Sequence, residues 1–441
     1  MSESLLSVGL DVGTTSTQMV VSRLRIENKA GSFAVPRMEI EMREILYKSP
    51  VHFTPLLHGD LVDAAALQEI VDKEYEAARI RKEDVDTGAI IITGETSRKE
   101  NARAVLDKLS GYAGDFVVAT AGPDLESVLA AKGAGAAAYS AKTGKRVLHM
   151  DIGGGTSNLA LIEDGKIVAT TCLNVGGRLL KMDPQGRLTY VSPVLEGIFS
   201  KKTGEVVTRE EVLELTERLV QALEAASGLR EEGALTGKLH TAGSAAFSPP
   251  ENVVISFSGG VADCIEEEKP WLAFGDMGPE LGQSIKNSRL CARPYRLGDE
   301  TIRATVIGAG SYSTQLSGST VFYQNIEFPL KNLSVVFTAE KLRMLDTPGV
   351  LALRGMHAPS YEALTALAGQ IISAFSGESL IVALEQDMAK ALGQILALRL
   401  GKTAKILCID RVQLEEESYL DVGAPVGPAL PVVVKTLILS R

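Results

Sequence analysis

The 441-residue sequence lacks clustered cysteines, and this absence argues against two kinds of stabilised site. Its four cysteines are widely scattered and include no C-x-x-C pair: Cys172, Cys264, Cys291 and Cys408. Closely spaced cysteine pairs signal zinc sites, and dense sets of cysteines signal disulfide frameworks. We therefore expect four reduced, buried thiols.

A charged leader, an apolar run of membrane-spanning length and an excess of basic residues are also missing. Lys and Arg number 45 against 55 Asp and Glu, so the formal net charge is -10. A negative chain is not attracted to nucleic acid or to an anionic membrane through a broad basic face. We expect a cytoplasmic protein with neither nucleic acid nor membrane as a partner.

What is present is the composition of a globular protein, with 45% hydrophobic and 23% charged residues. A chain of 441 residues exceeds the size at which a single core stops growing, so we expect two or three domains. A cleft between domains is therefore available for a ligand.

Glycine is unusually frequent, with 42 copies, and two glycine-rich turns each join two apolar strands. The first turn, Asp11–Ser16, lies within the strand-turn-strand pattern of residues 5–22. The second, Asp151–Thr156, joins strands expected at 147–150 and 158–162. The repeated hairpin predicts a duplicated architecture.

Glycines at such a turn let backbone N–H groups surround a phosphate without a crowding Cβ. Threonine hydroxyls add donors, and the aspartate that begins each turn can hold a hydrated Mg²⁺. The residues assigned to these contacts are Asp11, Gly13, Thr14, Thr15, Asp151, Gly153, Gly154, Gly155 and Thr156. Ordinary tight hairpins also use Gly and Thr, so a structural turn stays an alternative, a weaker one for the three consecutive glycines.

Apolar periodicity and capping signals predict further elements. Helices are expected at 64–80, 98–110, 124–142, 209–227, 360–375 and 380–400, and strands at 89–93, 116–119, 405–410 and 431–439. Thr208 and Glu211 form a capping-box pattern at the start of the fourth helix. A strand-turn-helix unit is expected over 252–265.

The two turns, in this order and at this separation, resemble the phosphate 1 and phosphate 2 loops of the actin, hexokinase and DnaK-type chaperone superfamily. In that superfamily a connecting helix precedes the second loop, and ESVLAAKGAGAAAY, which begins at Glu126, resembles it. RATVIGAGSYSTQL, residues 303–316, resembles the second connecting helix, where Gly308 would permit a close helix crossing.

Two further glycine pairs resemble motifs of the superfamily. SFSGGVADCI resembles the adenosine motif, which implies that Ser258, Gly259 and Gly260 lie against the adenosine. The alternative is a strand-to-helix turn of any α/β unit. Gly176 and Gly177 resemble the pair that opens a helix at the cleft edge and adds phosphate contacts.

The resemblance implies an α/β, actin-like ATPase fold: duplicated ribonuclease-H-like domains with a nucleotide cleft between them. It also implies that Glu126 positions the attacking water and that Asp11 and Asp151 serve catalysis by binding Mg²⁺ through water. An exposed glutamate favoured by the helix dipole is the alternative for Glu126. The expected parts are a first lobe at 1–146, a second lobe at 147–316 and a C-terminal α/β region completing the lobes at 317–441.

Segments beyond the nucleotide motifs extend the resemblance over nearly the whole chain. They are SVGLDVGTTSTQMVVSRL, ITGETSRKENA, HMDIGGGTSNLALIEDGKI, SGGVADCI, IVALEQDMAKALGQIL, YLDVGAP and PVVVKTL. The chain is similar to the reactivating factors of ethanolamine ammonia-lyase, which are ATP-dependent and chaperone-like. This similarity implies ATP and Mg²⁺ as cofactors, the lyase as partner, release of damaged cobalamin so that adenosylcobalamin can bind, and association with an ethanolamine-utilisation microcompartment.

Two other functions of the superfamily stay open. A small-molecule kinase would need a carboxylate base beside a substrate pocket. Asp60 and Asp63 are candidates, although both fit the cap and first turn of a helix better. An actin-like filament or scaffold ATPase is the other alternative.

Overall fold

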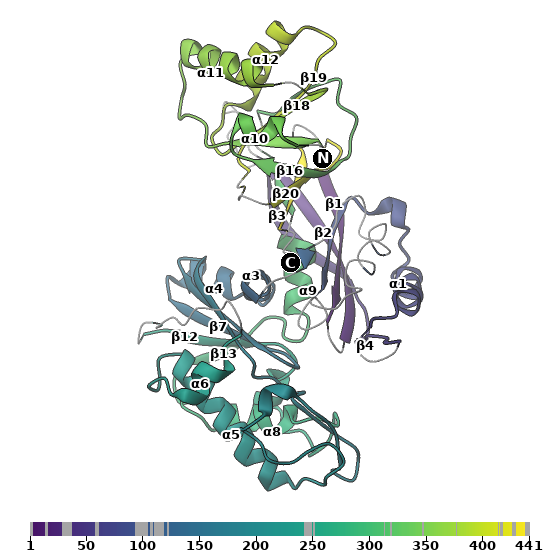
Figure 1. The fold of residues 1–441 in the computed structure, drawn as a ribbon, viewed down its shortest axis with the longest axis vertical. Coiled ribbons are helices and arrows are strands. Elements are labelled where there is room, and N and C mark those ends of the chain that lie inside the picture. Colours follow the sequence, from purple (N-terminus) through teal and green to yellow (C-terminus); the bar gives the residue numbers. More distant parts are fainter. Residues whose placement is uncertain are drawn as a thin grey trace.

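The computed structural model shows an elongated molecule with the C-terminal sheet at one end of its long axis, the N-terminal sheet in the middle and a third sheet at the other end (Figure 1). It describes the whole chain except residues 1–2, 14–15, 29–37, 58–60, 93–104, 106–108, 110–118, 121–122, 242–248, 250–251, 313, 318–319, 346–347, 376, 413, 415–417, 426–428 and 437–441.

Two of the sheets share one strand order and one pattern of strand directions. The first has the order β3 (Met38–Lys48), β2 (Ser16–Asn28), β1 (Glu3–Val12), β5 (Thr87–Ile92) and β6 (Ala119–Thr120), with β4 (His52–Phe53) beside β2. The second has the order β9 (Lys166–Leu173), β8 (Ser157–Glu163), β7 (Val147–Ile152), β12 (Val254–Ser258) and β13 (Tyr295–Leu297). β1 and β7 each pair antiparallel with the following strand and parallel with β5 or β12. The duplicated architecture predicted from the two hairpins is confirmed.

Two helices made largely of small residues cross between these sheets (Figure 1). α3 (Pro123–Gly133) packs on β7, β8 and β9, and α9 (Ala304–Tyr312) packs on β1, β2 and β5. A Cβ atom added to Gly308 would lie 2.0 Å from the backbone oxygen of Leu129, and one added to Gly133 would lie 1.9 Å from that of Ala304. Only glycine permits this crossing, as expected for Gly308.

The helix expected over 124–142 is divided in two. α3 ends at Gly133, and α4 (Ala136–Thr143) begins after Gly135, whose φ of 73° is left-handed. A left-handed residue cannot continue a right-handed helix, so the axis changes direction there. The helix expected at 98–110 and the strand expected at 116–119 lie almost wholly outside the described residues.

Several further described helices lie beside these two sheets, most of them beside the second. The elements are α1 (Ala64–Ala78) and η1 (Lys82–Asp84) beside the first sheet, and β10 (Leu180–Met182), β11 (Leu188–Val191), η4 (Pro193–Leu195), α5 (Arg209–Ala226), α6 (Ala234–Leu239), α7 (Asp263–Glu266) and α8 (Gly278–Lys286) beside the second. The capping box of Thr208 and Glu211 is present at the start of α5. The largest hydrophobic core lies between the second sheet and α5 and α8, and it includes the fully buried Phe257.

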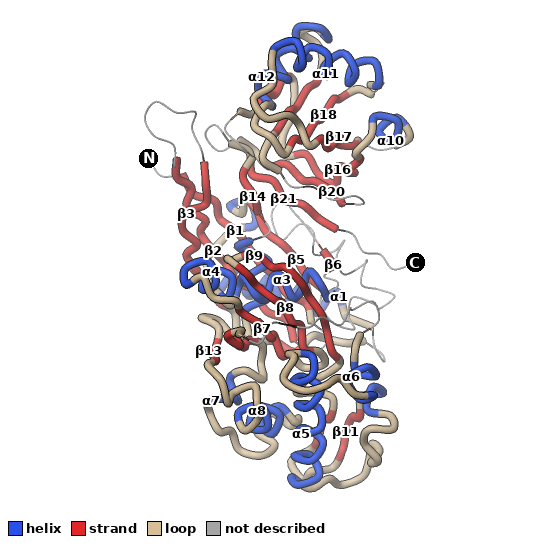
Figure 2. Tube along the Cα trace, turned by 90° about the vertical axis from the view of Figure 1, so that its left-hand side faces the viewer, coloured by secondary structure: helices blue, strands red, loops and turns tan. Residues whose placement is uncertain are grey.

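The C-terminal residues form a sheet of their own (Figure 2). Its order is β14 (Thr314–Leu316), β21 (Pro431–Thr436), β20 (Ser418–Val422), β16 (Leu330–Val336), β17 (Gly349–Leu353), β18 (Ser379–Leu384), β19 (Lys405–Ile409) and β15 (Phe322–Gln324). β16 to β19 are parallel and are connected through α10 (Ala339–Arg343), α11 (Tyr361–Ala374) and α12 (Ala389–Leu400). The domain boundaries at 146 and 316 stay predictions.

The helix expected over 380–400 is wrong in its first part. Residues 379–384 form strand β18, five of whose six residues are buried, and α12 begins only at Ala389. A short apolar run has the same appearance in a buried helix and in a buried strand, so periodicity could not distinguish them.

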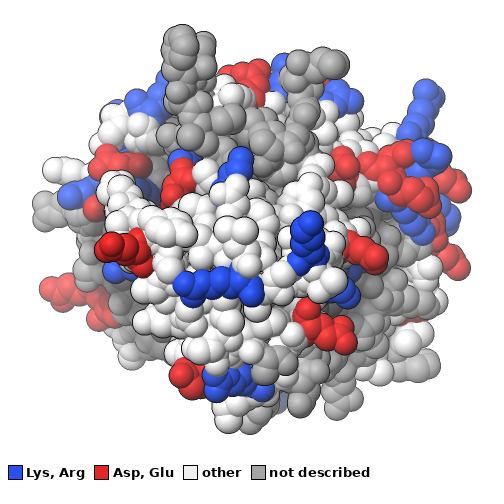
Figure 3. Space-filling model, turned by 90° about the horizontal axis from the view of Figure 1, so that it is seen from above, with Lys and Arg blue, Asp and Glu red and all other residues white. Residues whose placement is uncertain are grey.

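Charges of both signs alternate over the end of the molecule seen from above. Figure 3 shows Lys and Arg interspersed with Asp and Glu around a largely uncharged centre, so the described residues form no field of one sign on this face.

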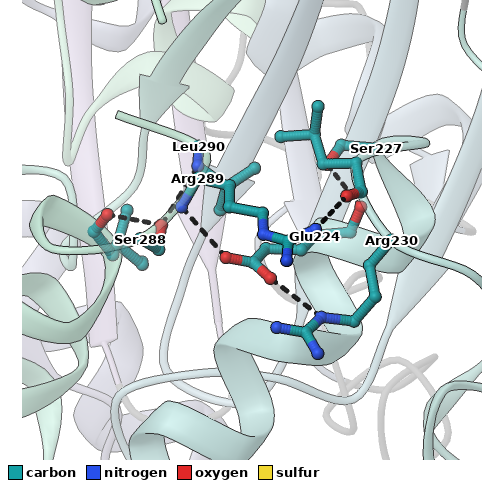
Figure 4. Close-up of polar contacts among 8 residues, drawn as sticks. Glu224, Ser227, Arg230, Ser288, Arg289 and Leu290 are labelled. Carbon is teal, nitrogen blue, oxygen red and sulfur yellow. Dashed lines mark hydrogen bonds and ion pairs between the residues drawn. The ribbon is translucent and has the colours of Figure 1, made fainter. Parts of the chain in front are cut away.

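Glu224, near the end of α5, joins this helix to the segment after α8 (Figure 4). Its side chain is 5% exposed. One carboxylate oxygen accepts a hydrogen bond from the Arg230 Nε at 3.0 Å, and the other accepts one from the backbone N–H of Arg289 at 3.0 Å. The Arg289 side chain in turn donates to the backbone oxygen of Leu229 at 2.9 Å.

Glu224→Ala is therefore expected to lower the free energy of unfolding by about 2 kcal/mol, because the Arg289 N–H and the Arg230 guanidinium both lose their charged acceptor. Urea unfolding followed by circular dichroism measures the change. Glu217→Ala, at an exposed position of the same helix, is the matched control and should stay within about 0.5 kcal/mol of the wild type. Equal midpoints for the two variants would contradict a joining role for Glu224.

Candidate functional site

The two glycine turns are closed by the same backbone hydrogen bond. Gly13 N–H donates to the Ser16 oxygen at 2.9 Å, and Gly153 N–H donates to the Thr156 oxygen at 2.9 Å. Each turn follows the central strand of its sheet, β1 or β7. Thr14 and Thr15 lie outside the described residues. Because the two sheets share one topology and each turn follows the central strand, the two turns lie at the corresponding edge of their respective sheets.

A second backbone segment closes on the Asp151–Thr156 turn. Gly177 N–H donates to the Gly153 oxygen at 3.0 Å, and Arg178 N–H donates to the Gly154 oxygen at 2.7 Å. A Cβ atom on Gly176 would lie 2.4 Å from the Gly154 oxygen, so the approach requires glycine. At Gly155, by contrast, no described atom lies within 4 Å of the corresponding position, so this side of the turn is open.

The expectation that Gly176 and Gly177 open a helix is wrong. The chain turns at Gly177 and Arg178 and enters strand β10 at Leu180. The N–H groups that would begin a helix there are used to hold the glycine turn. Their part in phosphate binding stays a prediction.

The Ser258–Gly260 turn packs directly on the strand that leads into the second glycine turn. Gly259 has a φ of 85°, and a Cβ atom there would lie 2.2 Å from the Ile152 oxygen. Val261 N–H donates to that same oxygen at 3.2 Å. The strand-turn-helix unit predicted for this stretch is confirmed, with β12 before the turn and the short α7 after it.

Asp151 is a buried carboxylate held by two hydroxyl groups. It is 6% exposed, it accepts a hydrogen bond from the Ser258 hydroxyl on Oδ1, and the Thr305 hydroxyl of α9 lies 3.4 Å from Oδ2. Burial raises the pKa of Asp151 to about 6, against the lowering effect of the two hydroxyls. The role of Asp151 in binding Mg²⁺ stays a prediction.

His149 orients this arrangement from inside the sheet. Its ring nitrogens lie 3.2 Å from the Ser256 hydroxyl and 2.9 Å from the Ser258 hydroxyl. Burial lowers the pKa of His149 to about 3, so the ring is neutral. The Ser258 proton goes to Asp151, so Nε2 of His149 must carry the ring proton and donate to Ser258. His149 is thus a fully buried core histidine.

The first turn is supported by a residue that sequence reasoning missed. The Thr54 hydroxyl donates to the Gly13 oxygen at 2.8 Å and lies 3.1 Å from the Thr17 hydroxyl. Asp11 lies in β1 opposite Gln18, partly buried. Nothing in the local sequence marks Thr54, because its contact is made across 41 residues.

Glu126 lies in the first turn of α3 and is partly buried. Its assignment to the attacking water stays a prediction. Asp63 is the N-cap of α1, accepting hydrogen bonds from Ala65 and Ala66 N–H at 3.0 Å each. This bears out the capping interpretation of Asp63, while Asp60 lies outside the described residues.

A cavity of about 260 Å³ is lined on one side by residues of β4 and the segment after it, and on the other by residues around β10 and before α8. Its lining residues are Phe53, Thr54, Leu56, Arg178, Lys181, Phe274, Gly275 and Asp276. Arg178 Nε donates to Asp276 Oδ2 at 3.1 Å, and Asp276 Oδ1 accepts from Gly278 N–H at 2.9 Å. Burial raises the pKa of Asp276, opposed by these contacts. Sequence reasoning missed Lys181 and Asp276.

The described residues contain no group of three or more His, Cys, Asp or Glu arranged to hold a metal ion.

None of the helices within the described ranges has the length and apolar character needed to cross a membrane.

Comparison with known proteins gives a consistent result over the whole chain. The family model described as "Ethanolamine utilisation protein EutA" matches residues 3–348 and 341–440. The ethanolamine ammonia-lyase reactivase EutA of Salmonella typhimurium is 39% identical, with 98% of each chain covered. The protein of that name from Escherichia coli is 38% identical, also with 98% of each chain covered.

Solved structures are more distant. EutJ of Carboxydothermus hydrogenoformans is 18% identical, with a TM-score of 0.36 over 69% of this chain and 89% of that one. The PPX-GPPA enzyme of Aquifex aeolicus is 15% identical, with a TM-score of 0.37 over 70% of this chain and 89% of that one.

Proposed function

Because this chain belongs to the ethanolamine utilisation protein EutA family, we propose that it is an ATP-dependent reactivase of ethanolamine ammonia-lyase. The observation that carries the nucleotide part of the proposal is the pair of identically closed glycine turns on equivalent strands of two sheets. The family relationship carries the choice of the lyase as the protein acted upon.

The residues of the two turns would divide the binding of Mg-ATP between them. Backbone N–H groups of Gly154 to Thr156, beside the open position at Gly155, are suited to the phosphates. Asp151 and Asp11 would hold water molecules of a bound Mg²⁺, which neutralises phosphate charge. The Ser258–Gly260 turn, packed on Ile152, would carry the adenosine, and Glu126 would position the attacking water.

The crossing of α3 and α9 suits a movement of the two sheets relative to each other. Each helix packs on one sheet, and the helices meet through backbone atoms at Gly133 and Gly308. Thr305 of α9 contacts Asp151 across this crossing. A change in phosphate occupancy would therefore bias the angle between the sheets, and the lyase would respond by releasing damaged cobalamin.

A kinase function has less support. Asp276 is the sole carboxylate among the described residues that line the cavity, and it is engaged by Arg178 and Gly278 N–H. A catalytic base must instead accept a proton from the substrate hydroxyl.

The proposal is tested by mixing the protein with ethanolamine ammonia-lyase blocked by cyanocobalamin, together with ATP, Mg²⁺ and free adenosylcobalamin. We expect lyase activity to return, and to return only when ATP and Mg²⁺ are both present. Activity no higher than in the mixture without this protein would refute the reactivase. Sedimentation of the protein with Mg-ATP alone would instead indicate a filament.

A further inference from the structure

We propose that Arg178 and Lys181 bind the terminal phosphate of ATP and allow the protein to distinguish ATP from ADP. This inference rests on the proposed function and assigns a role to the cavity that Arg178 and Lys181 line.

Two of the residues that line the cavity each contact one of the glycine turns. On the side of the first sheet, Thr54 lines it and donates to the Gly13 oxygen at 2.8 Å. On the side of the second sheet, Arg178 lines it and donates through its backbone to the Gly154 oxygen at 2.7 Å. In this proposal, a phosphate chain held between the turns directs its free end to the cavity, because a lining residue on each side contacts one of the turns.

The negative charge of a triphosphate favours a basic side chain beside its terminal phosphate. The turns Asp11–Ser16 and Asp151–Thr156 contain no Lys or Arg, and their N–H groups carry no net charge. A triphosphate keeps net negative charge after it has bound one Mg²⁺. Arg178 and Lys181 are the basic side chains among the described residues lining the cavity, and with Asp276 they leave a formal charge of +1.

The guanidinium of Arg178 is oriented before any ligand binds. Asp276 is only 7% exposed and is itself fixed by Gly278 N–H at the start of α8. It holds Arg178 Nε at 3.1 Å, while the Arg178 side chain stays 27% exposed. The Arg178 side chain also covers the glycine turn, with its Cδ 3.3 Å from the position of a Cβ on Gly154. A cation fixed in this way loses little entropy on binding phosphate.

Such a site would contact the third phosphate of ATP, which ADP lacks. ADP reaches the turns through its two phosphates but does not extend to the cavity. ATP would contact both walls, Thr54 with the first sheet and Arg178 with the second. Occupancy by ATP would then favour closure of the two sheets on each other.

The test is a calorimetric titration with Mg-ADP and with a non-hydrolysable Mg-ATP analogue, using the full chain. In Lys181→Gln and Arg178→Lys we expect the affinity for the ATP analogue to fall about tenfold or more, because charge-assisted contacts are lost or misaligned. The affinity for ADP should change less than about twofold. Thermal unfolding of each variant checks that the fold is kept.

Lys166→Gln is the matched control, since it removes the same charge from an exposed position at the start of β9. It should alter neither affinity. Equal losses for ADP and for the ATP analogue, or no loss for either, would overturn the inference while leaving nucleotide binding intact. A wild-type protein that binds neither nucleotide would overturn the proposed function and this inference with it.

Discussion

Asp151→Ala is expected to abolish Mg²⁺-dependent ATP hydrolysis, which release of inorganic phosphate measures directly. Asp151 is held by Ser258 and Thr305 at the end of β7, and its carboxylate is the group proposed to hold the waters of Mg²⁺. Without it, the cation that neutralises the phosphates loses its protein anchor. Turnover equal to that of the wild type would show that the second turn has been assigned the wrong role.

Asp151→Asn separates loss of the site from loss of the fold. Burial raises the pKa of Asp151 from 3.8 to about 6, so the ligand-free fold disfavours the charged form. This raised pKa means that the wild type is most favoured below about pH 4 and loses stability as the pH rises to about 6. At pH 8 and without ligand, the Asn variant should therefore unfold at the same temperature as the wild type or at a higher one. Its free energy of unfolding should exceed that of the wild type by up to about 2 kcal/mol.

The same experiment with Mg-ATP should give the opposite order. The wild type gains stability from the ligand by mass action, and the Asn variant gains little. An Asn variant that is less stable than the wild type without ligand would contradict the view that the buried charge is retained for binding.

Gly308→Ala is the second substitution with a large expected effect, about 3 kcal/mol of destabilisation together with loss of ATP hydrolysis. The added methyl would lie 2.0 Å from the Leu129 oxygen, and because this neighbour is backbone, no change of rotamer can relieve the contact. α3 and α9 must then separate, which also moves Thr305 away from Asp151. Chemical unfolding and phosphate release measure the two effects.

Gly237→Ala provides the control, because Gly237 lies in α6 and has no described atom near the position of the added methyl. The same substitution there should be neutral or stabilising by up to about 1 kcal/mol. Similar behaviour of the two alanine variants would mean that the close crossing is not needed for the fold.

Prediction from the sequence succeeded where the deciding contacts are local. The two glycine turns, the capping box at Thr208 and the Ser258–Gly260 turn each depend on residues a few positions apart. It failed where a local pattern admits two structures. Residues 379–384 are apolar in either a helix or a strand, and Gly176 and Gly177 could begin a helix or close a turn.

The sequence by itself determined the family, the paired turns and the aspartate that begins each of them, because backbone conformation and donor chemistry are set by neighbours in the chain. Only the tertiary structure decided which distant residues serve those turns. Thr54 contacts Gly13 across 41 residues of chain and Thr305 contacts Asp151 across 154, while Arg178 pairs with Asp276 across 98. The physical reason is that such contacts depend on the packing of two sheets around α3 and α9, and no short segment of sequence specifies that packing.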